Sequence, residues 1–493
     1  MNKLLSIPLL FLVLSGFGQQ GNSFLEPSFW KENPSVKTIK KKIKEGHDPA
    51  ALNDNAFDGV TYAINANASL ESILFMLEQE GNSVDKITHD NRNYLMWAAR
   101  MGNKPLIEHL IKEGSNTNLT DSHGYNALTF AAVAGVENMA IYDLLLSTGI
   151  AATSTNRSGA NALHLLAGSM KNDALIRYFE QKGLSIRSLD HNENGLFHYA
   201  AQRGNIEMMN LLIAEGLPYR TLNKAGENAM ILASKSGRRG SNGLEVFQFL
   251  DSKGVAADIV SWEGNTPLHG IAAGAKDEAI FDFFVDKGVN VNQVNEEGNT
   301  AFMLAAQRNN LKMLQKAEPY THDINRRNHE GESAVILAVK SGAASTFEYL
   351  KTRGADLSFK DAKGNDIFYH MFQSHSKRNA KAFQTFLNAA TANNLKPDSD
   401  TEILHIAVEK GEISLVKTAL KLGAKINHRN EEGLTPLHLA AMKAQSNDIL
   451  HLLLEHGADK GIKTEFEESA YDLAQENEVL AKNGVDLSFL KAN

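Results

Sequence analysis

The sequence predicts an all-α solenoid, a stack of short helix-turn-helix units that share one elongated core. Three observations favour this fold class. A phrase recurs about every 33 residues, most fully as Gly-Asn-Thr-Pro-Leu-His at residues 264–269 and Gly-Leu-Thr-Pro-Leu-His at residues 433–438. Each phrase opens a short segment rich in alanine, and a second apolar segment with helical spacing follows it. A fixed period in this range is typical of stacked supersecondary units.

The position of the threonine in this phrase, here termed the cap position, marks the start of each unit. Eleven of its thirteen occupants are Ser, Thr, Asn or Asp, whose side chains accept hydrogen bonds from the first free N–H groups of a helix. Pro267 and Pro436 follow the cap position directly, where the missing N–H of proline does no harm. We therefore expect a first helix after each cap position. The occupants are Thr61, Asn93, Asn126, Asn161, Gly195, Asn228, Thr266, Thr300, Ser333, Asp366, Glu402, Thr435 and Ser469.

A glycine is expected to end the second helix of most units, because it adopts the left-handed conformation found at helix C-termini. This glycine recurs at positions 81, 114, 149, 183, 216, 254, 288, 354, 423 and 457. The eighth and tenth units lack it, with Lys-Ala-Glu-Pro at 316–319 and Ala-Ala-Thr at 389–391. We expect irregular curvature at these two joints. One helical pair cannot bury its apolar face alone, so the core should lie between neighbouring pairs.

With these features the chain resembles the ankyrin repeat family over roughly residues 37 to 490. The resemblance implies about thirteen repeats, each a β-turn finger followed by two antiparallel helices, and a stack that curves around a concave groove. The tetratricopeptide repeat has a similar period but lacks the Gly-x-Thr-Pro-Leu-His start. Five histidines occupy the family's own histidine position, where the imidazole tethers neighbouring turns instead of binding a metal. They are His164, His198, His269, His405 and His438.

The domain prediction has three parts. Residues 1–18 are expected to be a signal peptide, with a basic start at Lys3, an apolar core over residues 4–13 and small residues at Gly16 and Gly18. Residues 19–56 should form an N-terminal extension with a capping helix, and residues 57–493 the solenoid, with its last repeat as a C-terminal cap. The signal predicts export to a periplasm or secretion. No other stretch approaches the roughly 20 apolar residues of a membrane span, so we expect none in the mature chain. A membrane anchor is the alternative for the first segment.

Composition excludes several function classes. The chain contains no cysteine, which removes disulfides, thiolate nucleophiles and cysteine zinc sites. Its net charge of −8 argues against a nucleic-acid binder. No GxSxG, HExxH, phosphate-binding or EF-hand motif occurs. We therefore expect a non-enzymatic, monomeric protein without a cofactor or a bound metal.

The family pattern implies that the seventh and eighth residues after each cap position face the groove. These positions supply seven basic residues and two acidic ones, Glu409 and Glu476, in a chain whose total is 58 acidic to 50 basic. Such a set would orient an anionic partner, although lysine and arginine are also ordinary residues of solvated helices. We term the seven the basic row: Arg100, Arg203, Lys235, Arg308, Lys340, Lys410 and Lys443.

Trp262 lies at a finger tip and is the best single aromatic candidate for a partner contact, because tryptophan often anchors interfaces. The alternative is a side chain packed between adjacent turns. A slower period also exists: the cap positions at 93, 195, 300 and 402 step by about three repeats and share similar wording after them. This suggests that a three-repeat block was duplicated.

The function that these features favour is an exported scaffold that binds a partner protein through its concave groove and finger tips. Two alternatives remain open. One is binding of an envelope glycan or other polyanion along the basic row. The other is a protective or inhibitory partner of one periplasmic enzyme.

Overall fold

The computed structural model describes residues 21–237, 240–398 and 401–491. Its regular elements in these ranges are helices, accompanied by isolated β-bridges and no named strand. The chain divides into two compact units, and each is described by itself. Unit 1 comprises Met1–Ala200 and Glu207–Leu217, and unit 2 comprises Ala201–Ile206 and Pro218–Asn493. The signal-peptide prediction for residues 1–18 lies outside the described residues. Within the described ranges, no helix combines the length and apolar character needed to cross a membrane.

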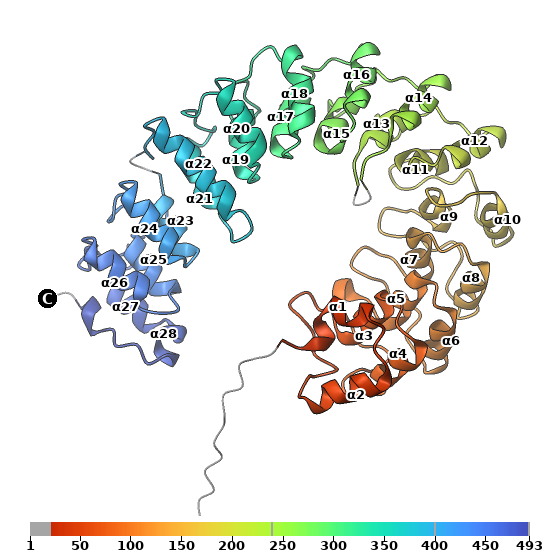
Figure 1. Ribbon diagram of the computed structural model, residues 1–493, viewed down its shortest axis with the longest axis horizontal. Helices are drawn as coiled ribbons and strands as arrows, with labels where there is room; N and C mark the ends of the chain where they lie inside the picture. Colours follow the sequence, from red (N-terminus) through yellow and green to blue (C-terminus); the bar gives the residue numbers. More distant parts are fainter. Residues whose placement is uncertain (1–20, 238–239, 399–400, 492–493) are drawn as a thin grey trace, which may run out of the picture. The chain divides into compact units, whose positions relative to one another are not determined.

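Unit 1 begins with a lid of short helices and continues as helical pairs that follow one another in chain order (Figure 1). The lid consists of η1 (Ser23–Leu25), α1 (Pro27–Lys31) and α2 (Val36–Lys44), and Trp30 of α1 is fully buried. The division between the units falls within α11 and α12. The remaining elements are α3 (Gly59–Asn65), α4 (Leu70–Leu77), η2 (His89–Asn91), α5 (Tyr94–Met101), α6 (Lys104–Lys112), α7 (Ala127–Ala134), α8 (Met139–Leu146), α9 (Ala162–Leu166), α10 (Ala174–Gln181), α11 (Leu196–Gln202) and α12 (Ile206–Ala214).

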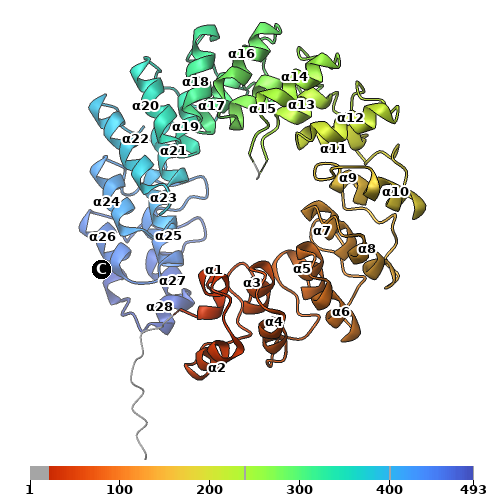
Figure 2. The same cartoon turned by 45° about the vertical axis from the view of Figure 1, so that its right-hand side comes forward.

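Unit 2 repeats the same arrangement, and the turned view shows its first helices lying side by side in succession (Figure 2). It ends in the short pair α27 and α28, followed by η4, whose Leu490 is buried. Its elements are α13 (Ala229–Ser234), α14 (Leu244–Ser252), α15 (Pro267–Gly274), α16 (Glu278–Asp286), α17 (Ala301–Gln307), α18 (Leu311–Ala317), η3 (Glu318–Tyr320), α19 (Ala334–Lys340), α20 (Ala344–Thr352), α21 (Ile367–Ser374), α22 (Ala380–Ala392), α23 (Ile403–Glu409), α24 (Ile413–Lys421), α25 (Pro436–Lys443), α26 (Asp448–Glu455), α27 (Ala470–Gln475), α28 (Glu478–Lys482) and η4 (Ser488–Leu490).

The first helices begin where the capping chemistry predicts, with one exception. Asn93 and Thr435, for example, directly precede α5 and α25 and accept backbone N–H groups of the first turn. The prediction for the first repeat is wrong, because α3 begins at Gly59 and not after Thr61. There the carboxylate of Asp58 accepts the backbone N–H of Thr61 at 2.8 Å, and Thr61 is buried inside the helix. Asp58 and Thr61 are both able to cap, and only packing decides between them.

The second helices end as predicted. All ten expected glycines have positive φ, between 70° and 95°. The two repeats without this glycine use other solutions. In the eighth, α18 runs directly into the 3-10 helix η3. In the tenth, α22 extends over 13 residues, and Asn394 takes the left-handed conformation with φ of 54°.

The core lies between neighbouring pairs, as the period requires. The main contacts of α5 are with its partner α6 and with the first helices α3 and α7 on either side. Small residues allow these first helices to approach closely: Ala98 and Ala99 of α5 and Ala131 and Ala132 of α7 are fully buried. Each repeat is therefore stabilised mainly by the repeats next to it.

Successive fingers are joined by backbone hydrogen bonds, a feature here termed the finger ladder. A residue near the tip of one finger donates its N–H to a carbonyl of the preceding finger. Because these bonds recur at equivalent positions, they fix the spacing of neighbouring fingers. In unit 2 the ladder consists of Trp262 to Ala225 at 2.9 Å, Glu296 to Glu263 at 2.7 Å, His329 to Glu297 at 3.0 Å and Ala362 to Glu330 at 2.7 Å.

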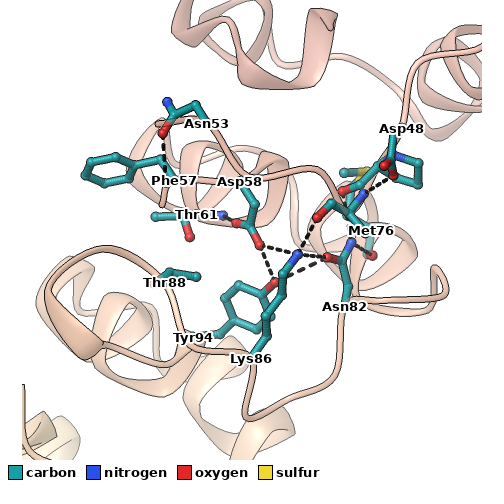
Figure 3. Close-up of polar contacts among 12 residues, drawn as sticks. Asp48, Asn53, Phe57, Asp58, Thr61, Met76, Asn82, Lys86, Thr88 and Tyr94 are labelled. Carbon is teal, nitrogen blue, oxygen red and sulfur yellow. Dashed lines mark hydrogen bonds and ion pairs between the residues drawn. The ribbon is translucent and has the colours of Figure 1, made fainter. Parts of the chain in front are cut away.

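A buried polar network joins the first two repeats (Figure 3). The carboxylate of Asp58, which is fully buried, accepts the hydroxyl of Tyr94 at 2.5 Å and lies 3.0 Å from the ammonium of Lys86. That ammonium also donates to the carbonyl of Ala50 and to the side-chain oxygen of Asn82. Burial, together with the charge of Asp58, raises the pKa of Tyr94 above its ordinary value. The network therefore links the N-terminal extension, α3 and α5.

Candidate interaction surface

The basic row lies at the ends of first helices, where the family resemblance places it, but its members differ in their surroundings. Arg100, in the last turn of α5, is exposed and donates to the side-chain oxygen of Asn65 at 2.7 Å. Its guanidinium also lies over the ring of Trp97. Part of this side chain is therefore committed to contacts within unit 1.

Three lysines of the basic row are paired with carboxylates. Lys235 lies 2.6 Å from Glu227, Lys443 lies 2.5 Å from Glu409, and Lys340 is paired with Glu332. Glu227 and Glu332 are almost entirely buried. The positive charge that the sequence predicts at these positions is thus largely compensated by the protein itself.

The sequence pattern did not predict that Glu227 and Glu332 are buried. Each directly precedes a cap position and resembles a solvated finger residue. Each is held by an asparagine of its own finger: Asn223 donates to Glu227 at 3.2 Å, and Asn328 donates to Glu332 at 3.1 Å. The same asparagine, glutamate and lysine thus recur three repeats apart, in the sixth and ninth repeats. This agreement supports the three-repeat duplication, and the spacing Asn-x-x-x-Glu is the signal that could have revealed the pairs.

The remaining members of the row are Arg203, Arg308 and Lys410. The ammonium of Lys410 donates to the carbonyls of Gln373 and His375, at 3.0 and 2.9 Å. Arg203 and Arg308 are exposed. Within the described residues, the guanidinium of Arg308 makes no side-chain hydrogen bond or ion pair, so Arg308 is the basic side chain of this row best able to meet a partner.

Two hollows lie along the first helices of unit 2. One, of about 360 Å³, is lined by Lys340 together with Asp361 and His370. The other, of about 310 Å³, is lined by Lys410 and Lys443. Both are small and have charged residues in their lining, which suits side chains of a partner protein better than a drug-sized apolar ligand.

Trp262 combines features of both alternatives considered for it. Its ring packs against Gly226 of the preceding finger, so closely that a Cβ atom at that glycine would lie 2.6 Å from the ring. The side chain is nevertheless 72% exposed, whereas Trp30 and Trp97 are buried. Gly226 therefore holds the indole in place without covering it.

His164, His269, His405 and His438, at the family position, act as tethers between turns. The Nε2 atoms of His269 and His438 lie 3.2 and 2.9 Å from the carbonyls of Asn299 and Ile462 in the following finger. Burial lowers the pKa of both imidazoles. His164 and His405 make the equivalent contact with Ser188 and Leu434, each at 2.9 Å. Among the residues that the structure describes, no three His, Cys, Asp or Glu side chains are grouped to hold a metal ion.

Known proteins share this sequence pattern in parts. A relative from Acanthamoeba polyphaga mimivirus, a putative ankyrin repeat protein, is 30% identical over 185 residues, which are 30% of this chain and 24% of that protein. The human transient receptor potential cation channel subfamily A member 1 is 25% identical over 405 residues, 73% of this chain and 36% of the channel. Among solved structures, the human ASB11 ankyrin repeat domain is similar with 22% identity and a TM-score of 0.38, over 46% of this chain and 99% of that one.

The relatives are longer than the segments they share with this chain, which spans about a quarter to two fifths of the first three in that comparison. The family model described as ankyrin repeats (3 copies) matches residues 95–190, 240–316, 271–361 and 371–464. These matches cover more than half of the chain and agree with the cap positions, the finger ladder and the histidine tethers. The chain therefore belongs to the ankyrin repeat family.

Proposed function

We propose that this chain is an exported scaffold that binds a partner protein through its finger tips and the ends of its first helices. Ankyrin repeats generally mediate protein–protein interaction, and the fold is typically a non-enzymatic scaffold. The observation that carries the proposal is Trp262, a tryptophan left 72% exposed but held in place against Gly226. Exposed aromatic side chains with a fixed position are frequent anchors of interfaces.

The basic side chains that we assign to the partner surface are Arg203 and Arg308, with Trp262 between them in the sequence. The carboxylate pairs of Lys235, Lys340 and Lys443 weigh against the alternative of a glycan or polyanion bound along the whole basic row. A polyanion needs uncompensated charge at most of these positions. A protein partner needs only a few anchors.

Export remains a proposal that rests on the N-terminal pattern. We expect cleavage after Gly18, which gives a mature chain that starts at Gln19. Mass spectrometry of the N-terminal peptide, from the cell envelope fraction and from the medium of expressing cells, tests this directly. Recovery of peptides that still contain Lys3 would reject it.

Site-specific photo-crosslinking tests the partner surface. A photoreactive amino acid at position 308, on the first-helix side, should yield a covalent adduct with one dominant protein in cells that express the full chain. The same amino acid at position 381, an exposed site on the second helix α22, is the matched control. Equal adducts at both positions, or none at 308, would contradict the proposed surface.

A charge-reversed pair provides a second measurement on the captured partner. We expect Arg203→Glu with Arg308→Glu to weaken binding and to reduce its salt dependence, because rim charges act mainly through long-range attraction. Lys312→Glu with Lys381→Glu makes the same change of charge on second helices. Equal losses in the two variants would show a general charge effect and no specific surface.

A further inference from the structure

One position of the finger repeatedly holds an exposed aliphatic side chain. It lies six residues before the cap position, and we term its occupants the finger row. Eleven large apolar side chains are exposed in the described residues, and five of them belong to this row. They are Leu52, six residues before the observed cap Asp58, and Ile87, Leu189, Leu222 and Val260, each six residues before a cap position. Isolated exposed leucines need no explanation, but a recurrence at one repeat position places the members from neighbouring repeats of one unit, such as Leu222 and Val260, on the same face of their fingers.

The finger row changes its chemistry once within unit 2. The sixth, seventh and eighth repeats supply Leu222 and Val260, which are 41% and 42% exposed, and the half-buried Val294. All five later repeats supply an exposed basic side chain. These are Arg327, Lys360, Lys396, Arg429 and Lys463. Three aliphatic positions are thus followed by five basic ones along consecutive fingers.

The finger ladder fixes the spacing between the first five members of the row in unit 2. Its four backbone hydrogen bonds join the fingers that carry Leu222, Val260, Val294, Arg327 and Lys360. Neighbouring repeats are spaced by about 10 Å, the distance between packed helices. A peptide in the polyproline II conformation rises about 3.1 Å per residue and has three residues per turn. Every third side chain of such an extended peptide lies on one face and can therefore meet one member of the row.

The charges of the fingers favour a peptide over a polyanion. Lys360 pairs with Asp398, and Lys463 lies 3.3 Å from Glu467. The guanidinium carbon of Arg327 lies 4.1 Å from the centre of the Phe359 ring. The finger tips themselves carry carboxylates such as Glu330 and Glu431. A uniformly negative polymer would meet these carboxylates, whereas a peptide can place its acidic side chains at the row alone.

We propose that the finger row of unit 2 binds an extended peptide segment of a partner with two parts. In one part aliphatic side chains at every third residue contact Leu222, Val260 and Val294. In the other, carboxylates pair with Arg327, Lys396 and Arg429, the basic members of the row without a carboxylate partner among the described residues, while Lys360 and Lys463 stay with Asp398 and Glu467. The inference rests on the proposed function and names the class of partner segment for the same scaffold.

Two labelled peptides of identical composition test this order. The block peptide carries three Leu-Ser-Gly triplets followed by five Glu-Ser-Gly triplets, and the mixed peptide interleaves the same triplets. Fluorescence anisotropy with the full chain should show the block peptide binding at least about tenfold more tightly, because only that peptide matches both parts of the row. Equal affinities of the two peptides, or tighter binding of inorganic polyphosphate, would overturn the inference.

Two variants of the row separate recognition from folding. Leu222→Ser with Val260→Ser should weaken the block peptide about tenfold, and Arg327→Glu with Lys396→Glu should reduce the salt-dependent part of its binding. Both should keep the thermal midpoint, because these side chains are exposed. Lys312→Glu with Lys381→Glu is the matched control. A marked fall in the thermal midpoint together with the loss of peptide binding would assign the row a structural role instead.

The captured partner of the crosslinking experiment distinguishes the two proposals. If the finger-row variants retain that partner while Arg203→Glu with Arg308→Glu loses it, the proposed function stands and this inference fails. If neither pair of substitutions affects the partner, both fail. Loss in the finger-row variants, with competition by the block peptide, supports both.

Discussion

At the scale of single residues, the buried carboxylate of Asp58 serves three contacts at once. It caps α3, accepts the hydroxyl of Tyr94 and pairs with Lys86, all without contact with solvent. A buried ion pair contributes little net stability compared with apolar packing, but removal of one partner leaves an uncompensated buried charge. The contribution of Asp58 to stability should therefore become apparent only when its side chain is replaced and its partners are left unpaired.

We predict that Asp58→Asn destabilises the first two repeats by about 3–5 kcal/mol, because Lys86 loses its counter-ion while it remains largely buried. Hydrogen exchange of α3 and α5 amides, measured by mass spectrometry, reports this directly. Glu45→Gln is the control, since Glu45 pairs with Lys41 and Lys42 at the surface, where such pairs contribute little to stability. Similar exchange in both variants would mean that the Asp58 network adds nothing to stability.

The histidine tethers predict a pH dependence of stability. Burial lowers the pKa of His164, His269, His405 and His438 below the ordinary value of 6.5. The unfolded chain therefore takes up protons first as the pH falls through 6.5, and protonation favours unfolding. We expect full stability above that pH and a progressive loss below it, as the pH approaches the lowered values.

Thermal midpoints measured between pH 8 and pH 5.5 should thus fall toward the acidic end, in a range where ordinary carboxylates stay ionised. The double variant His269→Asn with His438→Asn removes two of the tethers. Its midpoint should be lower at pH 8 and should vary less with pH. An unchanged slope would place the titration on other groups.

At the scale of elements, local chemistry explains most helix boundaries and packing explains the exceptions. The caps, the glycines with positive φ and the alanines between first helices could all be predicted from their neighbours in the sequence. Thr61 could not, because Asp58 three residues earlier caps equally well, and its choice depends on Lys86 and Tyr94 of the next repeat. Such contacts across repeats are invisible to a pattern within one repeat.

The candidate site was predictable to a similar degree. Repeat spacing placed Arg100, Arg308 and the rest of the basic row at first-helix ends, as found. It did not reveal that Glu227 turns inward to Lys235, because a glutamate in a polar linker resembles a solvated residue. Nor did it reveal the exposed Leu222 and Val260, since an aliphatic side chain is ordinarily expected in the core.

The glycine that ends each second helix allows a direct test at this scale. We predict that Gly354→Ala destabilises the ninth repeat by about 1–2 kcal/mol, the cost of the left-handed conformation for a residue with a Cβ. Its φ is 83° and no atom lies within 4 Å of the added methyl group, so strain and not collision is the cause. Amide exchange in α20 provides the measurement. In contrast, Asn394→Gly, at a left-handed residue of the tenth repeat, should leave exchange in α22 unchanged or slower.

At the scale of the whole molecule, we expect each repeat to depend for its stability on its neighbours and not on distant repeats. The main contacts of α25 are with α23, α26 and α27, which are its own partner and the first helices next to it. Contacts of this range couple neighbouring repeats and weaken with distance along the stack. A local defect should therefore remain local.

Leu453→Ala provides the test, because Leu453 of α26 is fully buried and a cavity at such a site costs about 2–5 kcal/mol. We expect native-state hydrogen exchange to accelerate in α24 to α28 and to stay unchanged in α3 to α6. Asp58→Asn should give the opposite distribution, with α3 to α6 accelerated and α24 to α28 unchanged. Each variant then serves as the control for the other. If either substitution accelerated exchange throughout the chain, unfolding would be a single cooperative event, and the neighbour-only account of stability would have to be abandoned.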